Sequence, residues 1–268
     1  MPPIIALLTD FGLSDPYVAQ IKAVLASRAP SALVVDVSHG VAPFNLIQAG
    51  FFLAASAPHF PAGTVFVTVV DPGVGSERRI VLLEAGGQLF LAPDNGLLGL
   101  VLERPGERRA FDLTPAAPPG VATFHGRDVF APLAAALVHG ASPDSLGPEV
   151  PVAELVVAAW SRPQLKGRVL LANVLHPDRF GNCILNLALE PWAETLAAWP
   201  ALRLDHPRPA PLTFCLLYGR IPAKAVGLLP GSQGYLELAM NRASAAAHLG
   251  LQSGALVRLT SGGEGGGA

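Results

Sequence analysis

The sequence predicts an α/β fold, with an N-terminal doubly wound domain on a mostly parallel sheet and a smaller, β-barrel-like C-terminal domain. Two observations support this class. Short apolar runs alternate with helix-like segments through the first half of the chain, which is typical of parallel sheets. Beyond residue 165 the segments become short and strand-like, and turns separate them.

The N-terminal elements each carry a local signal. Residues 4–8 form an apolar run before a polar loop, which indicates a buried strand. A cap donor and a proline in Ser14-Asp15-Pro16 are typical of a helix start. The β-branched run at 64–70 indicates a strand that ends at Asp71. We expect strands at 4–8, 32–37, 64–70, 80–84 and 88–92, and helices at 17–27, 45–57, 97–103 and 130–139.

The C-terminal part has a different pattern from about Trp160 onward. Strand-like segments are expected at 168–175, 183–187, 201–204, 212–217, 234–239 and 255–260. We therefore expect a first domain at residues 1–162 and a second at 166–262, with the glycine-rich residues 263–268 as a disordered tail.

Composition excludes several classes of protein. The 268 residues carry a formal net charge of −2, and only 14% are charged, so a nucleic-acid-binding or anionic-membrane-binding surface is not expected. The uncharged stretch 37–70 is broken by prolines and glycines, which argues against a membrane span. No secretory signal is evident. The two cysteines, Cys183 and Cys215, suggest neither a disulfide framework nor a zinc site, so we expect a cytoplasmic protein.

Three aspartates stand where predicted strands end. Asp10, Asp36 and Asp71 each follow or close an apolar run. In open α/β sheets, polar residues at the carboxyl ends of the strands form the ligand crevice. The sequence therefore predicts a site at this edge of the sheet.

Four polar clusters are candidates for chemistry, and each also has a simpler structural interpretation as a turn, helix cap or surface ion pair. The clusters are Asp71-Pro72-Gly73-Val74-Gly75 with Arg78 and Arg79, Phe124-His125-Gly126-Arg127-Asp128, Asp178-Arg179-Phe180-Gly181-Asn182, and Gly231-Ser232-Gln233-Gly234-Tyr235-Leu236-Glu237 with Asn241. The glycine spacing matches no phosphate-binding loop, and the sequence has no G-x-S-x-G elbow and no histidine pair with zinc spacing. We interpret His39 and His59 as structural.

Together with Leu8-Thr9-Asp10-Phe11-Gly12 and Pro93-Asp94-Asn95-Gly96, these clusters resemble the S-adenosyl-L-methionine hydroxide adenosyltransferases, relatives of the fluorinating and chlorinating enzymes. The motifs follow one another in order over most of the chain. The resemblance implies hydrolysis of S-adenosyl-L-methionine to adenosine and L-methionine. It also implies a homotrimer with the substrate between subunits, no metal and no separate cofactor, with the adenosine product as a candidate bound ligand.

The resemblance also implies roles for individual residues. Asp71, Arg78 and His125 match the group that activates water, and Asp10 matches the residue that holds the ribose hydroxyls. The remaining matches concern substrate binding: Asp178 and Asn182 at the amino end of the methionine, Ser232 at its carboxylate, Tyr218 stacked on adenine, and Asn241 at the adenine edge.

The expected reaction explains these residue types. Water attacks C5′ in line with a sulfonium that departs as a neutral thioether, so the protein needs to position one water and help remove its proton. We assign Arg78 and His125 to holding that water, and Asp71 to orienting the network and accepting a proton, directly or through His125. The alternatives are a halogenase acting at the same carbon, a non-catalytic sensor of S-adenosyl-L-methionine or adenosine, and a generic nucleotide-binding enzyme.

Overall fold

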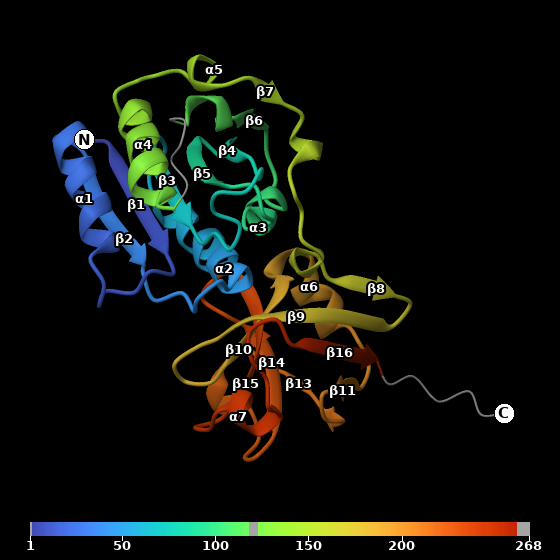
Figure 1. Cartoon of the computed structure of the whole chain (residues 1–268). Coiled ribbons are helices and arrows are strands. Elements are labelled where there is room, and N and C mark those ends of the chain that lie inside the picture. The colour runs from blue at the N-terminus through green and yellow to red at the C-terminus, as the bar shows by residue number, and fades with distance from the viewer. Residues whose placement is uncertain (1, 118–122, 262–268) are drawn as a thin grey trace. The chain divides into compact units, whose positions relative to one another are not determined.

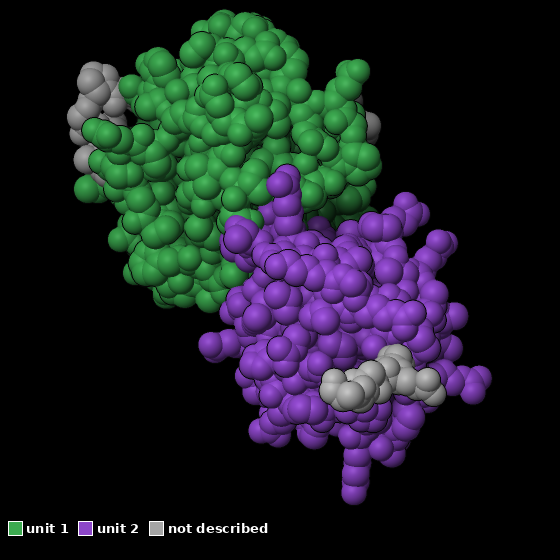
Figure 2. Space-filling view, turned by 90° about the vertical axis from the view of Figure 1, so that its right-hand side faces the viewer, with its two compact units in different colours: residues 1–158 green, residues 159–268 purple. Residues whose placement is uncertain are grey.

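The computed structural model describes residues 2–117 and 123–261, and these form two compact units (Figures 1 and 2). The units divide between Ala158 and Ala159, a few residues before the expected boundary. The expected tail at 263–268 lies outside the described residues. Each unit has its own core, so the two are taken in turn.

The first unit contains a seven-stranded sheet in the order β2-β1-β3-β5-β4-β6-β7. Its strands are β1 (Ile4–Thr9), β2 (Leu33–Ser38), β3 (Val65–Val69), β4 (Ile80–Ala85), β5 (Gln88–Pro93), β6 (Arg108–Asp112) and β7 (Glu149–Val150). Its helices are α1 (Tyr17–Arg28), α2 (Leu46–Ser56), α3 (Gly99–Leu102), α4 (Ala131–Val138) and α5 (Pro143–Leu146). Single turns lie at η1 (Ala57–His59), η2 (Thr114–Ala116), η3 (Gly126–Phe130) and η4 (Val152–Glu154).

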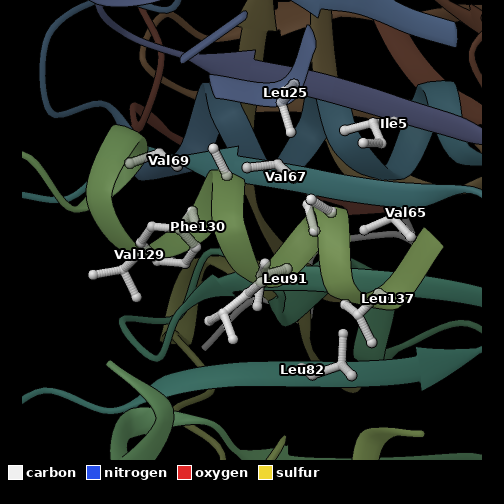
Figure 3. Close-up of a cluster of buried hydrophobic side chains, with 14 of the residues drawn as sticks. Ile5, Leu25, Val65, Val67, Val69, Leu82, Leu91, Val129, Phe130 and Leu137 are labelled. Atoms are coloured by element: carbon white, nitrogen blue, oxygen red, sulfur yellow. The ribbon is translucent and has the colours of Figure 1, made fainter. Parts of the chain in front are cut away.

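The core of the first unit follows the period of two expected for strands. Val65 and Val67 point to the face covered by α4, where they meet Phe130 and Leu137 (Figure 3). Phe66, between them in the sequence, faces the opposite side, stacks on Phe90 with ring centroids 5.0 Å apart and contacts the segment after α2. Both faces of the sheet are therefore covered, as the sequence predicted.

The sheet is mixed rather than mostly parallel. β2, β1, β3 and β5 pair in parallel, whereas β4, β6 and β7 add antiparallel strands. The reversal has a local cause: Gly86 and Gly87, between β4 and β5, have φ values of +57° and +74°. Two adjacent positive φ angles form the tight turn of a hairpin, which makes its strands antiparallel.

The second unit contains one sheet of nine strands within the described residues. They are β8 (Gln164–Lys166), β9 (Val169–Pro177), β10 (Cys183–Ala188), β11 (Leu202–His206), β12 (Ala210–Pro211), β13 (Thr213–Phe214), β14 (Val226–Pro230), β15 (Tyr235–Met240) and β16 (Leu256–Ser261). The other elements are η5 (Ala159–Ser161), α6 (Leu189–Ala197), η6 (Tyr218–Arg220) and α7 (Ala245–Leu249).

This sheet is barrel-like because its two outer strands are neighbours in the chain. The strand order runs β12-β11-β16-β9-β10-β15-β14-β13, and only Leu212 separates β12 from β13. The apolar residues of the strands fill the interior, with Leu185, Leu228 and Leu259 fully buried. The predicted fold class is thus confirmed. The expected strand at 212–217 is wrong beyond Phe214, because Leu216 and Leu217 are 76% and 63% exposed.

Candidate active site

Three residues predicted to act together meet at one end of the first sheet. The Arg78 guanidinium forms a two-pronged ion pair with the Asp71 carboxylate, with Nε 2.9 Å from Oδ2 and Nη2 also bonded to Oδ2. The same Nη2 lies 2.9 Å from Nδ1 of His125, which is 47 residues further along the chain. Asp71 and Arg78 are almost fully buried, with side chains 3% and 10% exposed. Arg78 therefore bridges the acid and the imidazole.

This bridge decides where the His125 proton lies. A guanidinium only donates hydrogen bonds, so the Nδ1 atom that faces Arg78 is the acceptor. The neutral imidazole then carries its proton on Nε2. In this tautomer Nε2 is a hydrogen-bond donor, and the Asp71 carboxylate supplies acceptor oxygens to the cluster.

Sheet topology explains why Asp71 and Asp10 share one edge. β1 and β3 pair in parallel with Thr9 opposite Val69, so the residues after both strands emerge together. The Asp10 carboxylate accepts a hydrogen bond of 2.8 Å from the backbone N–H of Phe44. Phe44 has φ +64°, a conformation that is uncommon for a large side chain and that this bond helps to hold.

The loop from Asp71 to Arg78 is secured by a second set of polar contacts. Asn95 Nδ2 donates to the carbonyl of Val70 at 3.0 Å, next to Asp71. Asp94 accepts from Arg79 Nη2 at 2.8 Å and from the Val156 N–H at 2.8 Å, and Arg79 also donates to the carbonyl of Glu154. The Pro93–Gly96 motif is therefore a support for the loop that carries Asp71 and Arg78.

A cavity of about 410 Å³ opens beside this cluster, a volume within the range of small-molecule sites. Its polar wall is formed by Asp10, Asp71 and His125. Its apolar wall is formed by Phe11, Tyr17, Pro43, Phe44, Val69, Val74 and Phe124, and Thr123 completes the lining. The rings of Phe11, Tyr17 and Phe124 contact one another with centroids 5.2–5.8 Å apart.

His125 reaches this cavity because the helix behind it starts early. The sequence predicted a helix from residue 130, but the chain already turns at η3, a π-helical turn that His125 precedes. Gly126 permits the close packing: a Cβ there would lie 3.0 Å from Ile21 of α1 and 3.3 Å from Phe11. A larger residue would therefore require the side chains of Ile21, Phe124 and Phe11 to shift.

Two further aspartates are engaged elsewhere. Asp36 lies within β2, where it pairs with Lys22 at 2.6 Å and contacts His39 at 3.1 Å. It does not line the cavity that Asp10 and Asp71 line, so its expected place in the crevice is wrong. Asp128 is not a helix cap, because it lies inside η3, whose N-cap is His125. Arg127 Nε binds it at 2.6 Å, as one of the simpler interpretations of that cluster predicted. This pairing lowers the pKa of Asp128.

The second unit contains the other predicted residues. Asp178 closes the β9–β10 turn on itself: Oδ1 accepts from the N–H groups of Phe180 and Asn182 at 2.8 Å, and Oδ2 accepts from Asn182 Nδ2 at 2.9 Å. Ser232 is exposed on the β14–β15 turn. Asn241 follows β15 and donates to the carbonyl of Ile221 at 3.5 Å. Tyr218 begins η6, and its hydroxyl donates to Glu237 Oε1 at 2.5 Å.

Glu237 was not singled out as a site residue by the sequence reasoning, although it stands in a quoted motif. Its side chain is buried, at 4% exposure, within the apolar strand β15. An acid in the middle of such a strand was the available signal, because buried carboxyls are rare unless they have a specific partner.

Within residues 2–117 and 123–261, no three metal-ligating side chains are grouped as a metal site would need. In the same part of the chain, no helix is both long and apolar enough to cross a membrane.

The α/β unit, with an acid and an imidazole that line a ligand-sized cavity and a guanidinium that bridges them, defines the chain as an enzyme that acts on a small molecule. It belongs to the S-adenosyl-L-methionine hydroxide adenosyltransferase family: the N-terminal domain of that family matches residues 5–147 and the C-terminal domain matches residues 172–258.

Curated relatives agree with this assignment. An (R)-S-adenosyl-L-methionine hydrolase from Thermus thermophilus is 44% identical, over 94% of this chain and 97% of its own length. A protein of the same name from Salinispora tropica is 37% identical, over 97% and 98% of the two chains. A fluorinase from an Actinoplanes species is 30% identical, over 96% and 97%.

Solved structures share the fold. A crystal structure of an uncharacterized conserved protein from Thermotoga maritima superposes with a TM-score of 0.83 at 30% identity, over 96% of this chain and 99% of that one. A conserved hypothetical protein from Thermus thermophilus has a TM-score of 0.75 at 42% identity, over 97% and 100%.

Proposed function

We propose that this enzyme hydrolyses S-adenosyl-L-methionine to adenosine and L-methionine, by in-line attack of a water molecule at C5′ of the ribose. The observation that carries the proposal is the Arg78 bridge between Asp71 and His125 at the wall of the cavity. The relatives named as hydrolases are 35–44% identical, whereas the fluorinases are 29–30% identical, which favours water over a halide as the nucleophile.

The chemistry balances without a redox step. One C–O bond forms as the C5′–S bond breaks, the bonding pair goes to sulfur, and the cationic substrate plus water gives adenosine, neutral thioether and one proton. The positive charge of the sulfonium disappears along the path, so a cavity that excludes bulk water favours the transition state.

Each member of the cluster has a task in this step. His125 Nε2–H and Arg78 hold the water oxygen, and Asp71 takes the proton into the shared network. Because the three groups are coupled, the proton belongs to the cluster rather than to one side chain. Positioning lowers a barrier of this kind by several kcal/mol, and a base contributes roughly 10²–10⁴-fold.

Substrate binding uses the other predicted residues. Asp10, oriented by the Phe44 N–H, accepts hydrogen bonds from the two ribose hydroxyls. In the second unit, Asp178 and Asn182 bind the amino end of the methionine moiety, and Ser232 binds its carboxylate. Tyr218 stacks on adenine, and Asn241 binds the adenine edge.

We also propose a cytoplasmic homotrimer that uses neither metal nor cofactor and has its active sites between subunits. Two large apolar side chains of the second unit, Phe180 and Leu216, are 78% and 76% exposed, and association of subunits is one way to cover them. Both cysteines are reduced and buried, which is in keeping with a reducing compartment. Sedimentation velocity of the full chain tests the trimer.

The purified chain should be incubated with S-adenosyl-L-methionine in buffer alone and with chloride or fluoride, and the nucleoside product identified by chromatography and mass. We expect adenosine in all three samples. A 5′-halogenated adenosine would establish the halogenase alternative. Tight binding with no product would establish the sensor alternative.

A further inference from the structure

A buried acid stands next to the adenine-stacking residue of the proposed site. Glu237 lies in β15 and is 4% exposed, and its Oε1 accepts the hydroxyl proton of Tyr218 at 2.5 Å. The space around the carboxyl is reserved for it: a Cβ on Gly231 would lie 2.7 Å from Glu237 Oε2. The β14–β15 turn therefore has a glycine at position 231, where a larger residue would contact this carboxyl.

The surroundings of Glu237 favour a neutral carboxyl. Within the described residues it forms no ion pair, and its bonded partner is a phenol. Burial raises the pKa of Glu237, the nearby charge of Asp178 raises it further, and the Tyr218 hydrogen bond opposes both effects. Burial of Cys183, together with the nearby charges of Asp178 and Glu237, raises the pKa of its thiol to about 12.

Tyr218 needs support of this kind. Tyr218 belongs to a helical turn of three residues. It is 46% exposed, and the preceding Leu217 is 63% exposed. A half-exposed ring on a short turn is free to change rotamer unless its polar end is bound. Glu237 binds that end from a strand inside the barrel-like sheet.

We propose that Glu237 is a positioning residue for substrate recognition, which holds the ring of Tyr218 in the orientation that stacks on adenine. The inference rests on the proposed function, in which Tyr218 contacts adenine. Glu237 acts through Tyr218 and does not touch the reacting atoms, so its loss affects binding rather than the chemical step.

The test compares steady-state kinetics of Glu237→Gln, Glu237→Ala, Tyr218→Phe and the double variant Glu237→Ala/Tyr218→Phe. A glutamine still accepts the hydroxyl proton, so Glu237→Gln should keep KM within about twofold. Glu237→Ala and Tyr218→Phe should each raise KM about tenfold with kcat within about twofold. The double variant should be no worse than either single one, because both remove the same bond.

Matched controls separate this bond from general effects. Tyr235→Phe removes a hydroxyl from the same strand, and Glu194→Ala removes an exposed carboxyl from α6; both should change KM less than twofold. If Glu237→Ala does not fold, Tyr218→Phe and Glu237→Gln still decide the question. An unchanged KM in Tyr218→Phe, or additive losses in the double variant, would overturn the proposal.

Binding measurements distinguish this inference from the proposed function. Calorimetric titration of the same variants with adenosine should rank them by Kd in the same order as the kinetics rank them by KM. If the wild-type chain produces no adenosine but the Kd pattern holds, the hydrolase proposal fails and the positioning role stands. If adenosine is produced and the Kd values do not change, only the positioning role fails.

Discussion

The polar clusters of the two units are built in opposite ways. In the first unit, Asp71 is matched by the guanidinium of Arg78, which also reaches His125. In the second, the carboxyls of Asp178 and Glu237 lie near each other, and their bonds go to amides, backbone N–H groups and a phenol. The first arrangement keeps charges that can act on a proton, whereas in the proposed function the second orients groups toward the substrate. The comparison teaches that an ion pair is suited to moving a proton when its cation also reaches an imidazole, as Arg78 does and Arg79 does not.

Loss of the imidazole tests the chemical side of the comparison and should have the largest effect. His125→Ala removes the donor opposite Arg78, and we expect kcat to fall about 10²–10⁴-fold with little change in substrate affinity. Steady-state kinetics and calorimetry measure the two quantities, and His59→Ala, on an exposed turn, is the control. Full activity in His125→Ala would remove the distinction between the clusters.

A change at Asp10 tests whether a residue proposed to bind ribose affects both substrate binding and the chemical step. Asp10→Asn keeps the size but weakens acceptance from the two hydroxyls, so we expect kcat/KM to fall about 10–100-fold, shared between KM and kcat. The same variant should bind methionine as the wild type does. An effect on kcat alone would move Asp10 into the water-activating group.

A smaller effect is expected from Asp94, which supports the loop that carries Arg78. Asp94→Ala removes the acceptor for Arg79 and for the Val156 N–H, so we expect a loss of about 1–3 kcal/mol in the free energy of unfolding and a several-fold lower kcat. Urea unfolding measures the first quantity. Stability lowered with kcat unchanged would mean that the loop keeps its geometry without this support.

The smallest effect concerns the pH dependence of Glu237. Its pKa in the folded chain lies above 4.5, so as pH rises past 4.5 the unfolded chain releases this proton first and the folded state loses stability. Glu237→Gln lacks this loss, so its Tm should rise relative to that of the wild type as the pH is raised from 4 to 8. Asp178, Cys183, Tyr218 and His176 face or neighbour Glu237. Burial raises the pKa values of the Cys183 thiol and the Tyr218 hydroxyl, so both groups keep their protons below pH 8 with or without Glu237. If the difference in Tm between the two proteins stayed constant across this range, folding would not raise the pKa of Glu237.

A feature of this protein could be predicted from the sequence where it depends on residues that are close together in the chain. The strand ends that carry Asp10 and Asp71 were readable because buried strands have a local apolar signature. The antiparallel turn at Gly86-Gly87 was equally local, but its effect on sheet order was not drawn from the sequence. The bond between Tyr218 and Glu237 joins residues 19 positions apart through the sheet, and no local pattern encodes it.

Site residues divide in the same way. Asp71, Arg78 and His125 were grouped through resemblance, and the structure brings them together although His125 is 47 residues beyond Arg78. Asp36 has the same strand-end signal as Asp71 but pairs with Lys22 from α1. Spacing alone does not distinguish the two aspartates, because the difference is the cation that the fold places beside each.

The most direct measurement is hydrolysis in water enriched in ¹⁸O, followed by mass analysis of both products. If a water gripped at the wall of the first-unit cavity attacks C5′, the heavy oxygen appears in the 5′-hydroxyl of adenosine and methionine stays unlabelled. Unlabelled adenosine, or a sulfur-containing nucleoside formed by cleavage at another carbon, would contradict the account.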